Sequence, residues 1–212
     1  MRIDFVSDVT CPWCAIGFTA LERALERLGG EVPVELHLQP FELNPGMPPE
    51  GEDIVRYMGR KYGLTAEQVA ERRAVIRERG AAVGFDFGPR THVWNTFDAH
   101  RLLHWAGLEG RGRELKRALL AAYHGRGENP GSLEVLRRLA GEAGLDGERA
   151  RAVLESGQYA DEVREMARHW QRLGIRSVPS VIVERRHLIQ GGQPVEVFEN
   201  ALREIAAGRE PA

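Results

Sequence analysis

The stretch Ile3-Asp4-Phe5-Val6-Ser7-Asp8-Val9-Thr10-Cys11-Pro12-Trp13-Cys14 decides the fold of this chain. Its first four residues form a mostly apolar run that predicts a strand, and a helical pattern continues from Ile16 to Leu28. Cys11 and Cys14 are the only two cysteines of the chain, and they stand three apart where the strand gives way to the helix. This placement predicts that the two sulfurs carry redox chemistry.

The predicted position of Cys11 at a helix N-terminus has a chemical consequence. Unpaired backbone N–H groups and the helix dipole favour an anion there, so the thiolate of Cys11 should be stabilised. Such sites lower a cysteine pKa from about 8.5 to roughly 3.5–7.5. Pro12 suits the first helical position, because no N–H is needed there and the fixed φ of proline is already helical.

The composition describes a globular chain of 212 residues, with 42% hydrophobic and 28% charged residues. This length allows one domain with an insertion or two small lobes. The net charge of −2 argues against a nucleic-acid partner. Lys61 and Lys116 are the only lysines, so the positive charges are almost all arginines, scattered along helix faces as solvated charges are.

The N-terminus predicts a cytoplasmic protein without a membrane partner. Met1-Arg2 leads straight into the first strand, with no signal-peptide pattern, and no apolar run is long enough to cross a bilayer. A single cysteine pair excludes a framework of structural disulfides. In the cytosol, a Cys-x-x-Cys pair is more naturally transient and catalytic.

The order of predicted elements is β-α-β, then a long helical block, then α-β-β-α. Strands are expected near 34–38, 177–183 and 187–190, with a turn-rich boundary over 40–49. Within the helical block, Asp53 should start one helix, and Thr65 with Gln68 should form the capping box of the next.

Asn95 is a polar residue at a position where an apolar one is expected. It falls on the predicted apolar face of a helix that continues through Ala99, Leu102 and Ala106. A buried amide without hydrogen-bond partners costs about 1–3 kcal/mol. Asn95 is therefore either a cap satisfied by nearby backbone groups or a residue that lines a substrate groove. The residues alone leave both alternatives open.

These motifs together resemble the thioredoxin fold. In that fold a proline, here Pro179 of Val178-Pro179, is cis and faces the cysteine pair across the substrate groove. Cys14 and Val178 are 164 positions apart, which leaves room for the inserted helical domain of bacterial DsbA-like oxidoreductases. The resemblance implies an α/β thioredoxin-fold domain over 1–43 and 157–212, with an all-helical insert over 44–156. Further stretches resemble the FrnE-like cytoplasmic subfamily: Ser7 to Cys14, Asn95 to Leu102, and Gly191-Gly192-Gln193.

The expected function is a thiol–disulfide oxidoreductase in which Cys11 attacks and Cys14 resolves. Its partner would be a thiol or disulfide, either a protein or a small molecule such as glutathione. This chemistry requires no metal or other cofactor, and the sequence leaves a homodimer open. The residues expected to bind substrate are Pro12, Trp13, Val178, Pro179 and Asn95.

Two other functions compete with this reading. Glutathione-dependent 2-hydroxychromene-2-carboxylate isomerases and kappa-class transferases share the fold, but typically carry serine at the position of Cys11. The second alternative is a zinc-binding or chaperone-like module, with His100 and His104 one helical turn apart as ligands beside Cys11 and Cys14.

Overall fold

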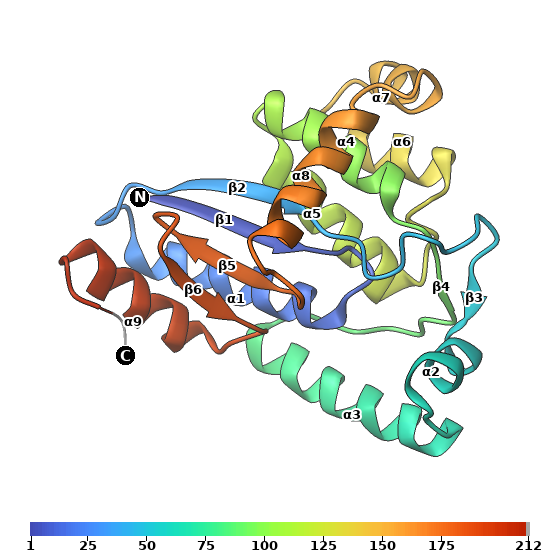
Figure 1. Ribbon diagram of the computed structural model, residues 1–212, viewed down its shortest axis with the longest axis horizontal. Coiled ribbons are helices and arrows are strands. Elements are labelled where there is room, and N and C mark those ends of the chain that lie inside the picture. The colour runs from blue at the N-terminus through green and yellow to red at the C-terminus, as the bar shows by residue number, and fades with distance from the viewer. Residues whose placement is uncertain (211–212) are drawn as a thin grey trace.

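A four-stranded mixed sheet lies at the centre of the computed structural model, which describes residues 1–210 (Figure 1). Its strand order is β2-β1-β5-β6, where β1 pairs parallel with β2 and antiparallel with β5, and β6 pairs antiparallel with β5. The strands are β1 (Arg2–Ser7), β2 (Glu35–Pro40), β5 (Ser180–Val183) and β6 (His187–Gln190). Central β5 is buried at every residue, whereas edge strand β6 alternates between half-buried and exposed positions.

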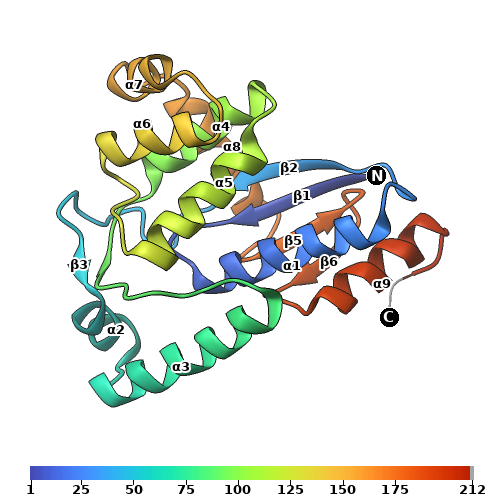
Figure 2. The same ribbon diagram turned by 180° about the vertical axis from the view of Figure 1, so that it is seen from behind.

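Helices cover both faces of this sheet. The long α1 (Pro12–Leu28) and the C-terminal α9 (Val195–Ala206) lie side by side on one face, as Figures 1 and 2 show from opposite sides. Their apolar side chains, among them Phe18 and Phe198, pack on Ile3 and Phe5 of β1. On the other face α8 (Ala160–Arg172) lies against β2.

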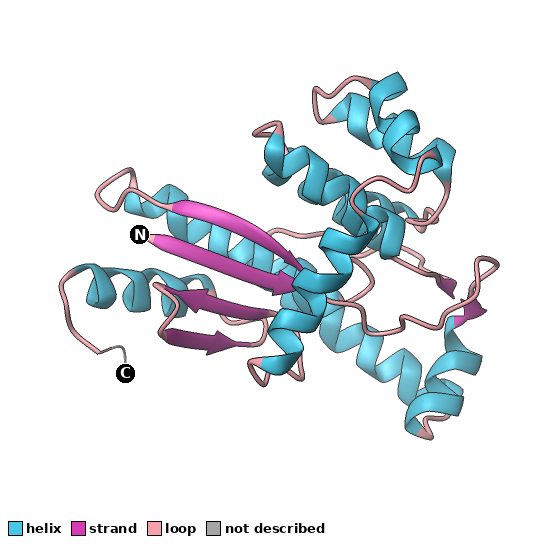
Figure 3. Cartoon of the chain, turned by 45° about the horizontal axis from the view of Figure 1, so that its top comes forward, coloured by secondary structure: helices cyan, strands magenta, loops and turns pink. Residues whose placement is uncertain are grey.

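The segment between β2 and α8 is mostly helical, and its helices gather around the end at which β1 and β2 finish (Figure 3). A second hydrophobic core joins α4 to α7 and includes Tyr123 and Leu136, while α3 packs directly on α1. No helix within residues 1–210 is long and apolar enough to span a membrane. The segment contains α2 (Ile54–Tyr62), α3 (Ala66–Val83), α4 (Phe97–Leu108), α5 (Gly112–Leu120), the π-helix η1 (Ala121–Gly125), α6 (Leu133–Glu142), α7 (Gly147–Glu155), and the short strands β3 (Glu52–Asp53) and β4 (His92–Val93).

Several predicted boundaries are confirmed. Asp53 caps α2 by accepting hydrogen bonds from the N–H groups of Val55 and Arg56. Thr65 and Gln68 form the predicted capping box of α3. The paired strands β3 and β4 were not predicted, because two residues are too few to show an alternating pattern.

The helix predicted to carry Asn95 on its apolar face begins later, at Phe97, so that prediction is wrong. The Asn95 side chain competes with the helix, because its Oδ1 accepts a hydrogen bond from the Phe97 N–H at 2.8 Å. Its Nδ2 donates to the Met47 carbonyl at 3.2 Å. Asn95 therefore ties the loop after β2 to the start of α4.

Candidate active site

The turn between β1 and α1 presents Cys11 at the start of the helix. The Asp8 carboxylate accepts hydrogen bonds from the N–H groups of Thr10 at 3.1 Å and Leu43 at 2.7 Å, which fixes the turn on the end of β2. Cys11 is the N-cap residue of α1 and Pro12 follows at the first helical position, as predicted. The Cys11 thiol consequently lies within the field of the helix N-terminus.

Three of the predicted features meet at this point. Cys11 and Cys14 are both free thiols, and the Cys11 Sγ donates to the carbonyl oxygen of Val178 at 3.6 Å. The Val178-Pro179 peptide bond is cis, which confirms the expectation from the thioredoxin resemblance. Cys11 is 4% exposed and Cys14 fully buried, whereas Trp13 is 38% exposed. Cys11 thus lies nearer the surface, with Cys14 behind it.

The two thiols have opposite pKa shifts. The pKa of Cys11 is lowered chiefly because Cys14 donates a hydrogen bond to its thiolate, and the Cys14 backbone N–H adds to this. Burial raises the pKa of Cys14 well above the ordinary cysteine value, and its hydrogen bond to Cys11 raises it further. Cys11 is therefore the sulfur that ionises first, and Cys14 holds its proton.

Lys116 of α5 is a buried cation next to this pair. It is fully buried, and its Nζ donates a hydrogen bond to Ser7 Oγ at 2.8 Å. Burial lowers the pKa of Lys116, whereas negative charge on Cys14, Asp8 and Cys11 raises it. By the same interaction, the ammonium lowers the pKa of Cys14.

His124 of η1 and Arg90 support the backbone just before Cys11. The His124 ring is fully buried, and its Nε2 lies 2.8 Å from the carbonyl oxygen of Val9. Its Nδ1 lies 3.2 Å from Arg90, which also donates to the Thr10 carbonyl at 3.3 Å. Since arginine can only donate, Nδ1 is the acceptor and Nε2 carries the proton. Burial, with the charge of Arg90, lowers the pKa of His124 well below its ordinary value and keeps the ring neutral.

Two glycines allow α1 to lie close to the Pro179 loop and to the turn that follows β6. A Cβ on Gly17 would lie 2.9 Å from the Pro179 ring, and one on Gly192 would lie 3.0 Å from the Trp13 carbonyl oxygen. The Gly191 N–H donates to the Pro179 carbonyl at 2.8 Å and ties the Gly191-Gly192 turn to the Pro179 loop. Small residues at these positions set the distance between Pro179 and the cysteines.

The histidines proposed as zinc ligands have other surroundings. The His100 Nε2 lies 3.8 Å from the Asp8 carboxylate, and the His104 ring packs against Tyr159 with ring centroids 5.1 Å apart. Within residues 1–210, no group of three or more histidine, cysteine or acidic side chains is arranged to hold a metal ion. The zinc alternative therefore has no geometric support.

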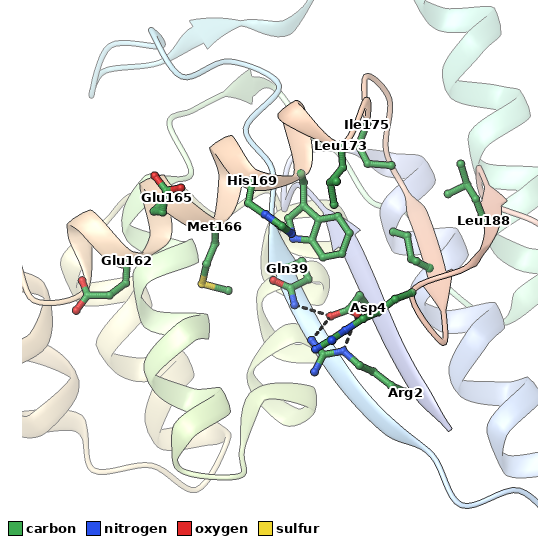
Figure 4. A pocket seen from close by; sticks show the side chains of 13 residues that line it. Arg2, Asp4, Gln39, Glu162, Glu165, Met166, His169, Leu173, Ile175 and Leu188 are labelled. Atoms are coloured by element: carbon green, nitrogen blue, oxygen red, sulfur yellow. Dashed lines mark hydrogen bonds and ion pairs between the residues drawn. The ribbon is translucent and has the colours of Figure 1, made fainter.

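A large cavity lies away from the cysteines, between α8 and the sheet (Figure 4). Its volume is about 930 Å³, and its lining includes Arg2, Asp4, Gln39 and Trp170. Asp4 already accepts hydrogen bonds from Arg2 at 2.7 Å and from Gln39 at 2.6 Å. None of the residues predicted to act on substrate lines this cavity.

Lys116, His124 and Gly17 were missed by the sequence analysis. For Lys116 a signal existed, since it precedes Leu119 and Leu120 by three and four residues and so shares their apolar helix face. No comparable signal marked His124 or Gly17, because their partners come from distant parts of the chain.

Comparison with known proteins agrees with this geometry. A family model described as a DSBA-like thioredoxin domain matches residues 2–203. The chain belongs to this family. The crystal structure of the probable DsbA oxidoreductase SCO1869 from Streptomyces coelicolor is similar, with a TM-score of 0.90 and 35% identity, covering 100% of this chain and 92% of that one. An uncharacterized protein of Bacillus subtilis strain 168, YwbO, is 29% identical over 95% of this chain and 96% of its own length.

More distant likenesses concern the fold alone. The cytosolic disulfide reductase DsbM from Pseudomonas aeruginosa, solved with GSH, has a TM-score of 0.66 and 19% identity, covering 98% of this chain and 100% of DsbM. A 2-hydroxychromene-2-carboxylate isomerase has a TM-score of 0.73 and 14% identity, covering 98% and 97% of the two chains. The predicted thioredoxin fold with a helical insert is confirmed.

Proposed function

We propose that this protein is a thiol–disulfide oxidoreductase that exchanges disulfides through Cys11-Pro12-Trp13-Cys14. The observation that carries the proposal is the placement of Cys11 at the start of α1, facing Val178-Pro179, with Cys14 buried behind it. The DSBA-like family membership supports the same class of chemistry.

The reaction begins with the Cys11 thiolate, which attacks one sulfur of a substrate disulfide. A bond forms between Cys11 Sγ and that sulfur, the substrate S–S bond breaks, and the other substrate sulfur leaves as a thiolate. Cys14 then loses its proton and attacks Cys11 Sγ, which releases the second substrate thiolate. The Cys11–Cys14 disulfide forms as the substrate gains two electrons, and the reverse sequence oxidises a dithiol.

Residues around Cys11 and Cys14 would bind the thiol or disulfide substrate. The exposed Trp13, with Pro12 beside it, offers apolar contact, and the Val178 backbone next to Pro179 would bind an extended segment. A substrate role for Asn95 stays a prediction, because its amide bonds to backbone groups of the chain itself. The partner would be a thiol or disulfide such as glutathione, and we place this activity in the cytoplasm.

Stopped-flow mixing of the reduced protein with 5,5′-dithiobis(2-nitrobenzoate) tests the proposal. Wild type should release one equivalent of nitrothiobenzoate as Cys11 attacks and a second as Cys14 resolves. Cys14→Ser should stop after the first equivalent and keep a mixed disulfide on Cys11, visible by mass spectrometry. Cys11→Ser should lose the fast first release, because the remaining Cys14 is buried with a raised pKa.

Two results would contradict the proposal. One is a Cys11→Ser variant that reacts as fast as the wild type. The other is a wild-type protein that releases two equivalents without forming the Cys11–Cys14 disulfide. A further measurement is iodoacetamide labelling of Cys11 against pH, whose midpoint should lie below about 8.5 and rise in Cys14→Ala, which removes the side-chain hydrogen-bond donor.

A further inference from the structure

A second cavity lies beside the candidate active site and is rich in arginine. Its volume is about 370 Å³, and α3 contributes Arg73 and Arg77 to its wall. The loop over 87–90 contributes Arg90, and His124 closes the wall. No acidic side chain of the described residues lines it.

The three guanidinium groups lack carboxylate partners, within the part of the chain that the structure describes. Arg73 donates to the carbonyl of Arg90 at 2.9 Å, and Arg90 contacts only a carbonyl, a histidine ring and the face of Tyr123. Many arginines on other helices form ion pairs, as Arg168 does with Glu165. The positive charge of this cavity is therefore not neutralised by the chain.

The pKa of Arg73 reflects this excess of positive charge. Burial lowers it, and the charges of Arg90 and Arg77 lower it further. Asp53 and the Tyr123 phenol oppose this shift, but the Asp53 carboxylate already caps α2 through two backbone N–H groups. An anion entering the cavity would relieve this repulsion between like charges.

Arg90 connects the cavity to the nucleophile. It donates to the Thr10 carbonyl, one residue before Cys11, and His124 binds the carbonyl of Val9. In Figure 2 the chain between α3 and β4 passes close to the start of α1. The cavity wall therefore reaches the backbone of the active-site turn.

We propose that this cavity is an anion subsite that binds the carboxylates of a small disulfide or thiol substrate. Guanidinium groups bind carboxylates through paired, charge-assisted hydrogen bonds, and 370 Å³ falls within the range of small-molecule sites. The inference rests on the proposed function and names the substrate class of the same site: anionic, low-molecular-weight disulfides, reduced by Cys11 and Cys14 in the two steps given above.

The test compares two disulfides in single-turnover reactions with the reduced protein. Oxidised glutathione carries several carboxylates, whereas hydroxyethyl disulfide carries none. The rate ratio of the first to the second should fall roughly tenfold in Arg73→Ala/Arg77→Ala and about threefold in Arg77→Ala alone. Arg77 is exposed and unpaired among the described residues, so its replacement leaves the packing intact.

Arg79→Ala is the matched control, because it removes the same charge from an exposed position of α3 outside the cavity. It should leave the ratio unchanged. An unchanged ratio in the double variant, or an equal fall in Arg79→Ala, would overturn the subsite.

A binding measurement separates this inference from the proposed function. S-methylglutathione cannot exchange disulfides, so calorimetric titration reports the subsite without redox chemistry. Its Kd should rise roughly tenfold in Arg73→Ala/Arg77→Ala and stay constant in Arg79→Ala. The stopped-flow reaction with 5,5′-dithiobis(2-nitrobenzoate) decides the oxidoreductase function, and this titration decides the subsite whatever the outcome of that reaction. A wild type that does not bind S-methylglutathione would overturn the subsite alone.

Discussion

Lys116 explains how a thiol as deeply buried as Cys14 can give up its proton. Burial opposes a thiolate at Cys14, whereas the ammonium of Lys116 and a hydrogen bond with the Asp8 backbone lower the pKa of this thiol. Lys116 itself is fully buried, with a single hydrogen bond to Ser7. We interpret Lys116 as a positioning residue that stabilises charge on Cys14 during resolution.

Replacing Lys116 by methionine should separate reactivity from stability. In Lys116→Met the second release of nitrothiobenzoate should slow by roughly tenfold, because loss of the ammonium raises the pKa of Cys14 and leaves less thiolate to resolve the mixed disulfide. The first release should change less, because the largest contribution to the lowered pKa of Cys11 comes from Cys14. The free energy of unfolding should stay constant or rise by about 1 kcal/mol, because a buried charge is removed.

Ser7→Ala is the companion variant for Lys116→Met. It removes the hydrogen-bond partner of Lys116 but keeps the charge, so its second release should slow less. Equal resolution rates in Lys116→Met and wild type would show that Lys116 does not assist Cys14.

The first turns of α1 are shaped by their contact with the Pro179 loop. Helix propensity favours alanine over glycine within a helix by about 1 kcal/mol. At Gly17 a Cβ would lie 2.9 Å from Pro179, so packing opposes propensity there. The same conflict is absent at Gly141 of α6, where a Cβ would meet no atom within 4 Å.

Gly17→Ala and Gly141→Ala should therefore change stability in opposite directions. Gly17→Ala should lower the free energy of unfolding by about 1 kcal/mol or more, because overpacking exceeds the gain in propensity. Gly141→Ala should raise it by up to about 1 kcal/mol. Urea denaturation measures both, and stabilisation by Gly17→Ala would mean that the Pro179 loop moves away from α1 at little cost.

Over the whole molecule, Asp8 joins three separate parts of the chain. It lies between the end of β1 and α1, accepts a hydrogen bond from Leu43 after β2, and faces His100 of α4. Burial raises the pKa of Asp8, but His100 and the N–H groups of Leu43 and Thr10 outweigh burial, and the net shift is downward. The ionised carboxylate thus links the sheet to the helical segment.

The sign of this shift predicts how stability depends on pH. Because the pKa of folded Asp8 lies below that of the unfolded chain, about 3.9, its stabilisation is complete above that pH and is lost as pH falls through the folded value. Asp8→Asn should lower the free energy of unfolding by about 2 kcal/mol at pH 7. This difference should shrink below pH 4, whereas Asp161→Asn, at a 98% exposed carboxylate, should change little. A difference that stays constant with pH would contradict the role of the charge.

Features that depend on residues close in the sequence could be predicted, whereas features that depend on contacts between distant segments could not. Capping by Asp53 and Thr65, and the helix start at Cys11, depend on neighbouring residues and were predicted correctly. The start of α4 was not predicted correctly. It depends on the Asn95 amide, which donates a hydrogen bond to the Met47 carbonyl of a loop distant in the sequence. The predicted boundaries of the helical insert, 44–156, stay a prediction.

By itself, the sequence determined that two cysteines stand at a strand-to-helix junction and that the chain alternates β, α and β around a helical block. These properties follow from local spacing and from the conformational limits of proline and glycine. Only the tertiary structure decided what surrounds Cys14: burial holds the proton on this thiol, and Lys116, far along the chain, opposes that effect. It also decided that Arg73, Arg77 and Arg90 surround one cavity. The charge there is uncompensated because the fold brings three arginines together and places no acidic side chain of the described residues in the cavity wall.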